Sequence, residues 1–180
     1  MKTKMILTIV FIVLVLCIGY ASFNASKLMT IDIKETVVIK GVMDKVFDEV
    51  KYFENFLNWS PFLAKDPTQQ ISVTGQDGTV GAQYHWEGNK GKDLGLQEIK
   101  EIQEGRYIKM QCDILKPFKA QPIFEYTFDK VNDGILVTQD FHLESSFMDA
   151  FFMGIFGAKK EMKTTNQEGL SLLKKSVEGS

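Results

Sequence analysis

Arginine, histidine and cysteine are scarce in this chain of 180 residues. Of its 21 basic residues only Arg106 is an arginine, and the net charge is -2. A groove for nucleic acid needs clustered basic side chains, so the composition predicts no nucleic-acid partner. A single arginine also excludes an anion site built from several bidentate guanidinium groups.

The two cysteines and two histidines are too few to indicate a disulfide framework or a metal centre. Cys17 lies in an N-terminal apolar run, and Cys112 lies among hydrophobic residues of an extended segment. We therefore expect no internal disulfide, and we expect Cys112 to belong to the core. A structural zinc site needs about four such ligands, so we expect neither a metal nor another cofactor.

A long run without charged residues lies near the N-terminus, between Lys4 and Lys27. The 22 residues from Met5 to Ser26 would extend about 33 Å as a helix, which matches one hydrocarbon core. Two interpretations remain open. The run is either an uncleaved membrane anchor, which its length favours, or a signal peptide cleaved after Ala21.

Both interpretations place the remainder of the chain outside the cytoplasm, because Lys2 and Lys4 precede the apolar run. The protein would be membrane-anchored if the segment is retained and secreted if it is cleaved. We assign residues 1–26 to the anchor or signal segment and residues 27–180 to a folded domain. Residues 26–30 are expected to form a short linker.

Hydrophobic periodicity predicts the order of elements in the folded domain. A strand is expected over 31–40, followed by a helix from Val42 to Phe53 and a second short helical turn over 55–60. Turn signals then separate six further strands. Their expected ranges are 70–74, 80–87, 95–103, 106–115, 120–131 and 135–144.

The C-terminal part is expected to be helical. Ser146 and Asp149 have the spacing of a helix N-cap with its acidic partner, and Gly154 and Gly157 predict a bend or break. A long amphipathic helix follows, with one apolar stripe formed by Met162, Asn166, Leu170, Leu173 and Val177. The fold class is thus α+β: a curved antiparallel sheet of about seven strands wrapped around a long C-terminal helix.

This order of elements, with these residues, resembles the START-like or SRPBCC superfamily, also called the Bet v 1-like helix-grip fold. The polyketide cyclase/dehydrase-like branch is the most similar. The resemblance covers about residues 31–178, and it rests on the segment VVIKGVMDKVFDEV, on Asn58-Trp59-Ser60-Pro61, on Gly81 to Trp86 and on QEGLSLLKKSVE. It implies that residues 27–180 form a ligand-binding domain with an apolar cavity between sheet and helix.

Strand alternation predicts which side chains face that cavity. The inward set is dominated by aromatic residues, and its polar members are two tyrosine hydroxyls, an indole N–H and two amides. Our candidate ligand-binding residues are Trp59, Phe62, Tyr84, Trp86, Phe124, Tyr126, Gln139, Phe141 and Asn166. The alternative interpretation is that these aromatic residues only pack the core.

The same alternation places His85 and His142 on the outer face, so no catalytic residue is assigned. One strand is ambiguous, because Ile99 and Ile102 cannot both face inward without a bulge. If that strand turns Glu98 or Glu101 inward, the cavity would contain a carboxylate.

The segment Phe147–Phe156 is apolar on almost every side. One interpretation is that it covers one end of the cavity. The other is that its outer side enters the membrane beside the anchor and acts as a gate for a lipophilic ligand.

Three functions compete at this stage. The first is a membrane-tethered, non-enzymatic protein that binds a small hydrophobic or lipid-like molecule. The second is a cyclase- or dehydratase-like enzyme acting on a hydrophobic substrate in the same cavity, which requires an inward carboxylate such as Glu98. The third is an interaction module whose cavity has closed. The missing inward acid or base favours the first.

Overall fold

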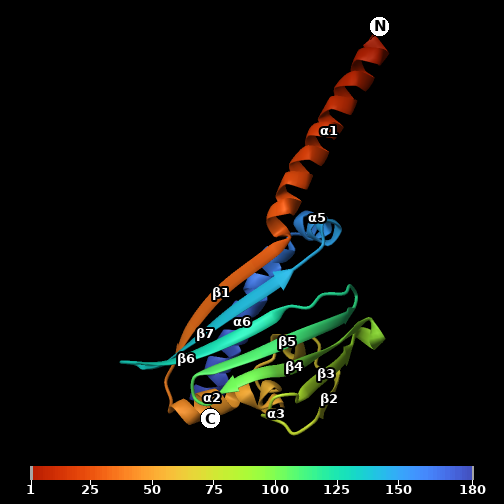
Figure 1. Ribbon diagram of the computed structural model, residues 1–180. Helices are drawn as coiled ribbons and strands as arrows, with labels where there is room; N and C mark the ends of the chain where they lie inside the picture. The colour runs from red at the N-terminus through yellow and green to blue at the C-terminus, as the bar shows by residue number, and fades with distance from the viewer. Residues whose placement is uncertain (1, 180) are drawn as a thin grey trace.

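The structure is a computed structural model that describes residues 2–179, and it consists of a curved antiparallel sheet, a helical layer and one projecting helix (Figure 1). The elements follow in the order α1 (Lys2–Leu28), β1 (Thr30–Ile39), α2 (Met43–Lys51), α3 (Phe53–Phe56), α4 (Pro61–Lys65), β2 (Gln70–Thr74), β3 (Gln83–Gly88), the 3-10 turn η1 (Asn89–Gly91), β4 (Asp93–Gln103), β5 (Tyr107–Lys116), β6 (Ile123–Val131), β7 (Gly134–Glu144), α5 (Phe147–Phe156) and α6 (Ala158–Glu178).

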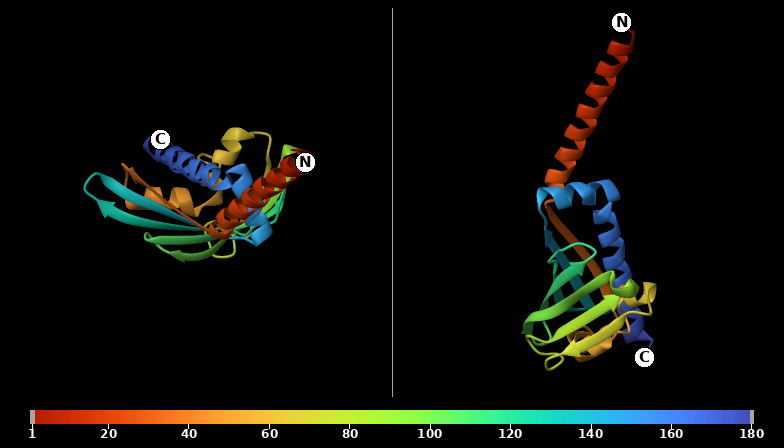
Figure 2. Two further views of the ribbon diagram at one scale, coloured as in Figure 1. Left: turned by 90° about the horizontal axis from the view of Figure 1, so that it is seen from above. Right: turned by 90° about the vertical axis from the view of Figure 1, so that its right-hand side faces the viewer.

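The seven strands form one sheet in the order β1-β7-β6-β5-β4-β3-β2, and all neighbours are antiparallel. Consecutive strands from β2 to β7 are joined by short connections, so they pair with their sequence neighbours. β1 forms the edge of the sheet opposite β2, and it pairs with β7 over its whole length. The sheet curves around α6, with α2 and α3 at the lower end (Figure 2). The predicted α+β architecture is confirmed.

The main core lies between the sheet and α2, α3 and α6. On α6 the buried residues recur every three or four positions, which gives the helix one apolar stripe. Leu170, Leu173 and Val177 of this stripe pack in one cluster with Phe47 of α2 and Phe128 of β6. The rings of Phe47 and Phe128 meet edge to face, with centroids 5.0 Å apart.

A smaller apolar cluster lies at the end of the sheet nearest α1 and α5. Its buried members come from β1 and β7, and half-buried residues from α1, α5 and α6 pack against them. This smaller cluster contains Ile31, Ile33, Phe141 and Leu143, with Leu28, Ala120, Phe124, Met153 and Met162 around them.

The expected bulge is present in β4. The register with β5 shifts between Ile99 and Glu101, so that Ile99 pairs with Met110 while Ile102 pairs with Ile108. The extra residue lets both isoleucines face the core although their spacing is odd.

Several predicted boundaries were wrong. The helix expected to reach Phe53 ends at Lys51, the turn expected over 55–60 is α3 with α4 after it, and β6 begins at Ile123 and not at residue 120. β3 begins at Gln83 rather than at residue 80, because Gly81 has a φ of +89° and Val80 remains 60% exposed in the preceding turn. Residues 26–30 do not form a linker: α1 continues to Leu28, and β1 starts at Thr30. The last turns of α1 stay helical because they pack against α5, where Ala25 is fully buried.

The predicted cap and break around α5 are both confirmed. The Ser146 hydroxyl accepts a hydrogen bond from the Asp149 backbone N–H at 3.2 Å, as an N-cap does. Gly157 has a φ of +66°, and this left-handed residue ends α5 and starts α6 in a new direction. As a result α5 lies across the base of α1 at the top of the domain (Figure 2).

Candidate ligand-binding site

Buried polar side chains of the interior include Tyr126 of β6, Gln139 of β7 and Asn166 of α6, which we call the polar centre. Tyr126 and Gln139 are register partners on adjacent strands, and the Gln139 Nε2 donates a hydrogen bond of 2.7 Å to the Tyr126 hydroxyl. Burial raises the pKa of Tyr126, so its phenol stays protonated at neutral pH. Asn166 is the buried polar residue of the α6 stripe.

Two atoms of this centre are buried without a hydrogen-bond partner among the described residues: Gln139 Oε1 and Asn166 Nδ2. The side chains of Gln139 and Asn166 are only 4% and 7% exposed. A buried unpaired polar atom costs about 1–3 kcal/mol, and such atoms are uncommon in native proteins. One is an acceptor and the other a donor, so each of them could form a hydrogen bond with a hydroxyl or protonated carboxyl group of a ligand.

Aromatic side chains line the interior beside this centre. Trp59 and Tyr126 meet edge to face with ring centroids 6.3 Å apart, and Tyr84 lies 6.4 Å from Trp86. Both indole N–H groups are already occupied. Trp59 Nε1 donates to the Glu49 backbone carbonyl at 2.9 Å, and Trp86 Nε1 donates to Asp93 Oδ1 at 3.0 Å. Neither indole therefore offers a free donor.

The structure brings most of the predicted lining residues together in the interior. Buried residues among them are Trp59, Tyr84, Tyr126, Gln139, Phe141 and Asn166, whereas Trp86 and Phe124 are half-buried. Phe62 lies on α4 and is 50% exposed, which separates it from the others. Their roles in ligand binding stay predictions.

Sequence reasoning missed Gln97, which is buried in β4 and donates from Nε2 to the Met110 sulfur at 2.9 Å. Because of the bulge, alternation could not decide which side chains of β4 point into the interior. The signal that could have found Gln97 is its pairing with Tyr84 across the β3–β4 hairpin, since directly paired residues share a face.

Glu98, the inward carboxylate that the cyclase-like alternative requires, does not face the interior. Its side chain accepts from Gln83 Nε2 at 3.1 Å and forms an ion pair of 2.8 Å with Lys100, on the outer face of the sheet. The hydrogen bond from Lys100 lowers the pKa of Glu98. Among the side chains that the structure describes, no carboxylate, lysine, arginine or histidine is buried.

Both histidines lie on the outer face, as predicted. His85 Nε2 is 3.1 Å from the Thr74 hydroxyl, and His142 Nδ1 is 2.7 Å from Asp32 Oδ1. The hydrogen bond to Asp32 raises the pKa of His142. These contacts hold neighbouring strands together on the convex surface, so neither imidazole can reach a molecule bound inside.

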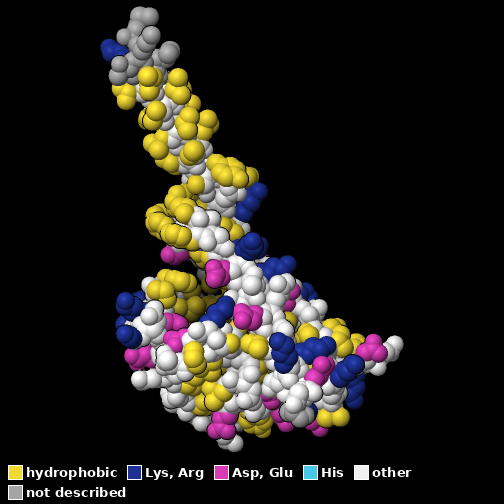
Figure 3. Space-filling view, turned by 180° about the vertical axis from the view of Figure 1, so that it is seen from behind, with side chains coloured by type: hydrophobic (Ala, Val, Ile, Leu, Met, Phe, Trp, Pro, Cys, Tyr) yellow, Lys and Arg dark blue, Asp and Glu magenta, His cyan; other side chains and the backbone are white. Residues whose placement is uncertain are grey.

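A hollow with partly hydrophobic walls lies directly below α5 when the molecule is seen from behind (Figure 3). Apolar side chains also cover α1 and α5 on this face, in contrast to the mixed surface of the domain below them. The exposed apolar residues of α5 are Phe147, Met148, Phe152, Ile155 and Phe156. Hydrophobic surface is therefore concentrated where the domain meets the projecting helix.

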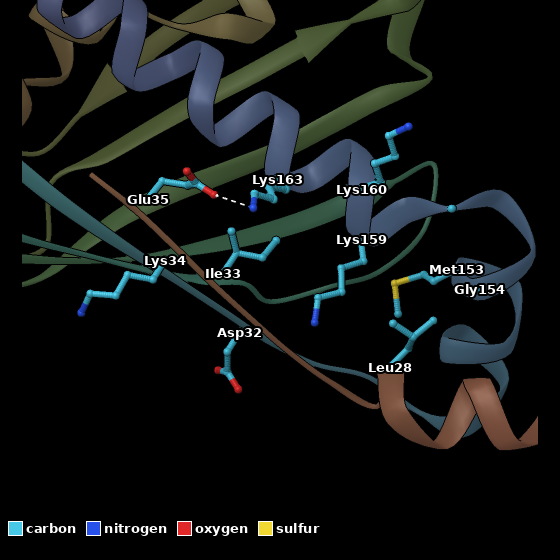
Figure 4. Close-up of a pocket in the computed structure, with 11 residues that line it drawn as sticks. Leu28, Asp32, Ile33, Lys34, Glu35, Met153, Gly154, Lys159, Lys160 and Lys163 are labelled. Atoms are coloured by element: carbon cyan, nitrogen blue, oxygen red, sulfur yellow. Dashed lines mark ion pairs between the residues drawn. The ribbon is translucent and has the colours of Figure 1, made fainter. Parts of the chain in front are cut away.

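A separate cavity of about 560 Å³ lies where α1, β1, α5 and the start of α6 meet (Figure 4). None of the predicted ligand-binding residues lines it. Its walls are formed by Leu28, Asp32, Ile33, Lys34, Glu35, Met153, Gly154, Gly157, Lys159, Lys160 and Lys163.

No protein-family model and no curated protein matches this chain. Solved structures do. Protein CV1439 from Chromobacterium violaceum aligns with a TM-score of 0.61 and 14% identity over 82% of this chain and 96% of that one. Ara h 8.0201 aligns with a TM-score of 0.60 and 14% identity over 84% of this chain and 99% of that one.

The di-domain ARO/CYC StfQ from the steffimycin biosynthetic pathway aligns with a TM-score of 0.58 and 9% identity. This match covers 83% of this chain and 51% of StfQ, so the chain spans about half of the di-domain protein. At such identities the similarity establishes the fold alone. The protein has the helix-grip fold, as the sequence predicted.

Proposed function

We propose that this protein is a membrane-tethered binding protein for a small hydrophobic or lipid-like molecule held between the sheet and α6. The observation that carries the proposal is the pair of buried, unpartnered amide atoms, Gln139 Oε1 and Asn166 Nδ2. A ligand with one polar end would satisfy both atoms, and its apolar body would lie against aromatic side chains.

The arrangement of residues around the two amides gives the ligand a direction. On β7 the next inward residue after Gln139 toward α5 is Phe141, and Phe124 is its register partner on β6. On α6 the residue one turn nearer α5 is Met162, which is half-buried like Phe124. We therefore orient the ligand with its polar end at Gln139 and Asn166 and its apolar tail in the smaller apolar cluster around Ile33 and Phe141. With α1 as the tether this becomes the membrane-proximal cluster.

The N-terminal helix supports the tether. Residues Ile6–Leu28 form a helix long and apolar enough to cross a membrane, and an 18-residue window within it has a mean hydropathy of 2.7. Helix α1 passes into β1 across Met29 alone and packs against α5, so its base is part of the folded domain. These features favour a retained anchor over a cleaved signal, with the domain outside the cytoplasm because Lys2 and Lys4 precede the span.

The cyclase-like alternative has less support in the chain itself. StfQ is an ARO/CYC protein of similar fold. General acid–base chemistry requires a titratable group near neutral pH within hydrogen-bond reach of the substrate. Here Glu98, the carboxylate on which that alternative depended, bonds to Lys100 on the outer face.

Native mass spectrometry of the full chain, extracted from membranes in mild detergent, tests the proposed function. We expect a bound apolar molecule at one copy per chain. After delipidation, added oleic acid should restore a one-to-one complex. A chain that is empty in every preparation and does not take up oleic acid, cholesterol or a phospholipid would contradict the proposal.

A further inference from the structure

We propose that the cavity between α1, β1, α5 and α6 binds the headgroup of an anionic phospholipid from the bilayer that α1 spans. This inference rests on the membrane tether of the proposed function. It concerns a second site, distinct from the interior between sheet and α6.

The cavity lies at the depth where headgroups are found. Leu28, which lines it, is the last residue of the candidate span Ile6–Leu28. A span of this length crosses the hydrocarbon core, so its end lies at the level of the headgroups. The cavity volume of about 560 Å³ is within the range of small-molecule sites.

Helix α5 fixes the cavity against the end of α1. Ala25 of α1 and Ala150 of α5 are both fully buried, and a Cβ on Gly154 would lie 3.2 Å from the Leu28 Cδ1. Small residues of this kind allow two helices to approach closely. With α5 lying across α1, its exposed Phe156, which is 77% accessible, can enter the same interface.

The charge of the cavity walls is complementary to an anion. Four lysines line it, against Asp32 and Glu35. Both acids are already engaged, since Asp32 accepts from His142 at 2.7 Å and Glu35 pairs with Lys163 at 3.6 Å.

The unbalanced positive charge of the cavity walls comes from the start of α6. Lys34 is paired with Asp140, whereas Lys159 and Lys160 have no ion-pair partner among residues 2–179. Lys159 points into the space between α6 and β1 (Figure 4). Lys27, at the end of α1, contacts the Phe23 ring but no carboxylate within the described part of the chain. Basic groups at a membrane surface attract anionic lipids.

The apolar walls identify a lipid rather than a free anion. Leu28, Ile33 and Met153 line the same cavity as the lysines and belong to the membrane-proximal cluster. A soluble phosphate would leave these side chains in contact with water. A phospholipid places its phosphate beside Lys159 and its glycerol and first acyl carbons against Leu28 and Met153.

Nanodiscs provide the test with the full chain. The protein is reconstituted in equimolar phosphatidylcholine and phosphatidylglycerol, and the lipids retained after ejection are counted by native mass spectrometry. We expect at least a fivefold enrichment of phosphatidylglycerol. K159Q/K160Q should reduce it to less than twofold. The matched variant K130Q/K175Q makes the same charge change at two exposed lysines at the opposite end of the domain and should keep it.

Each other outcome contradicts the proposal in a recognisable way. Equal retention of both lipids would exclude a headgroup site, and equal losses in both double variants would indicate only nonspecific charge attraction. Displacement of the lipid by 10-fold excess glycerol phosphate would indicate a site for soluble anions. Failure of the chain to enter nanodiscs would overturn the tether and this site together. Uptake of oleic acid by the interior should not change in K159Q/K160Q, so the two sites are scored separately.

Discussion

Replacing Asn166 with leucine should stabilise the empty protein and weaken ligand binding in the interior. The side-chain amide is 7% exposed, and its Nδ2 has no hydrogen-bond partner among the described residues. A leucine of similar size removes this unpaired donor, so we expect the free energy of unfolding to rise by about 1–2 kcal/mol. The ligand loses its hydrogen bond and part of its space, so we expect at least a 10-fold fall in affinity for oleic acid.

Chemical denaturation of the delipidated full chain and titration with oleic acid measure the two effects. Asn58→Leu is the matched control, because Asn58 is exposed and its amide is bonded to Glu49 at 3.3 Å. The control should bind oleic acid normally and gain no stability. If Asn166→Leu is instead less stable and still binds oleic acid, Asn166 has a structural role and does not contact the ligand.

Replacing Gly95 with alanine should destabilise the domain by about 3 kcal/mol. Gly95 pairs with Trp86 across the β3–β4 hairpin, and a Cβ at this position would collide with the indole ring. The same Cβ would lie 2.6 Å from the Asp113 backbone carbonyl on β5, which cannot move without breaking the sheet. The absence of a side chain at Gly95 is therefore what lets Trp86 lie flat against β4.

Urea unfolding and the Trp86 emission maximum measure this effect. Gly169→Ala is a control for which we expect the opposite change in stability. Gly169 lies within helix α6, and an added Cβ would make an ordinary contact of 3.5 Å with Pro61. Gly169→Ala should raise the free energy of unfolding by about 0.5–1 kcal/mol, because alanine has a higher helix propensity than glycine. Equal stability of Gly95→Ala and the unsubstituted chain would show that the hairpin can move away from β5, and that Trp86 is not fixed in place.

The sheet could be predicted from the sequence because its strands are joined by short turns. Alternation then assigned Tyr126 and Gln139 to one face, and the hydrogen bond between them follows from their direct pairing. The polar residue Asn166 was found from helical spacing within an otherwise apolar stripe. That its Nδ2 has no partner depends on the packing of α6 against the sheet, which a periodic pattern does not contain.

Other parts of the site depend on contacts between distant segments. Strand alternation predicts that the Trp86 indole N–H faces a ligand, but the hairpin turn brings Asp93 Oδ1 within 3.0 Å of it. The cavity between α1, β1, α5 and α6, which we call the headgroup cavity, forms only where residues 28–35 meet residues 153–163. The linker expected over residues 26–30 does not predict this contact, because a flexible segment would have separated the anchor from α5.

The two proposed sites are neighbours that have two apolar side chains in common. Met153 and Leu28 line the headgroup cavity and also pack against the membrane-proximal cluster, into which the tail of the interior ligand is oriented. A lipophilic molecule leaving the bilayer beside α5 would thus meet apolar surface along its whole path. Substitutions in α5 should therefore alter the rate of uptake more than the final affinity.

Quenching of Trp59 by a brominated fatty acid tests the central claim most directly. The chain has two tryptophans, so in Trp86→Phe all indole emission comes from Trp59, which is 3% exposed and packs against Tyr126. Dibromostearate added to this full-length variant in detergent should quench the emission and saturate at one molecule per chain. Asn166→Leu in the same background should raise the concentration of dibromostearate needed for saturation at least 10-fold. Emission that is unchanged, or that falls linearly and equally in both variants, would contradict a ligand site between the sheet and α6.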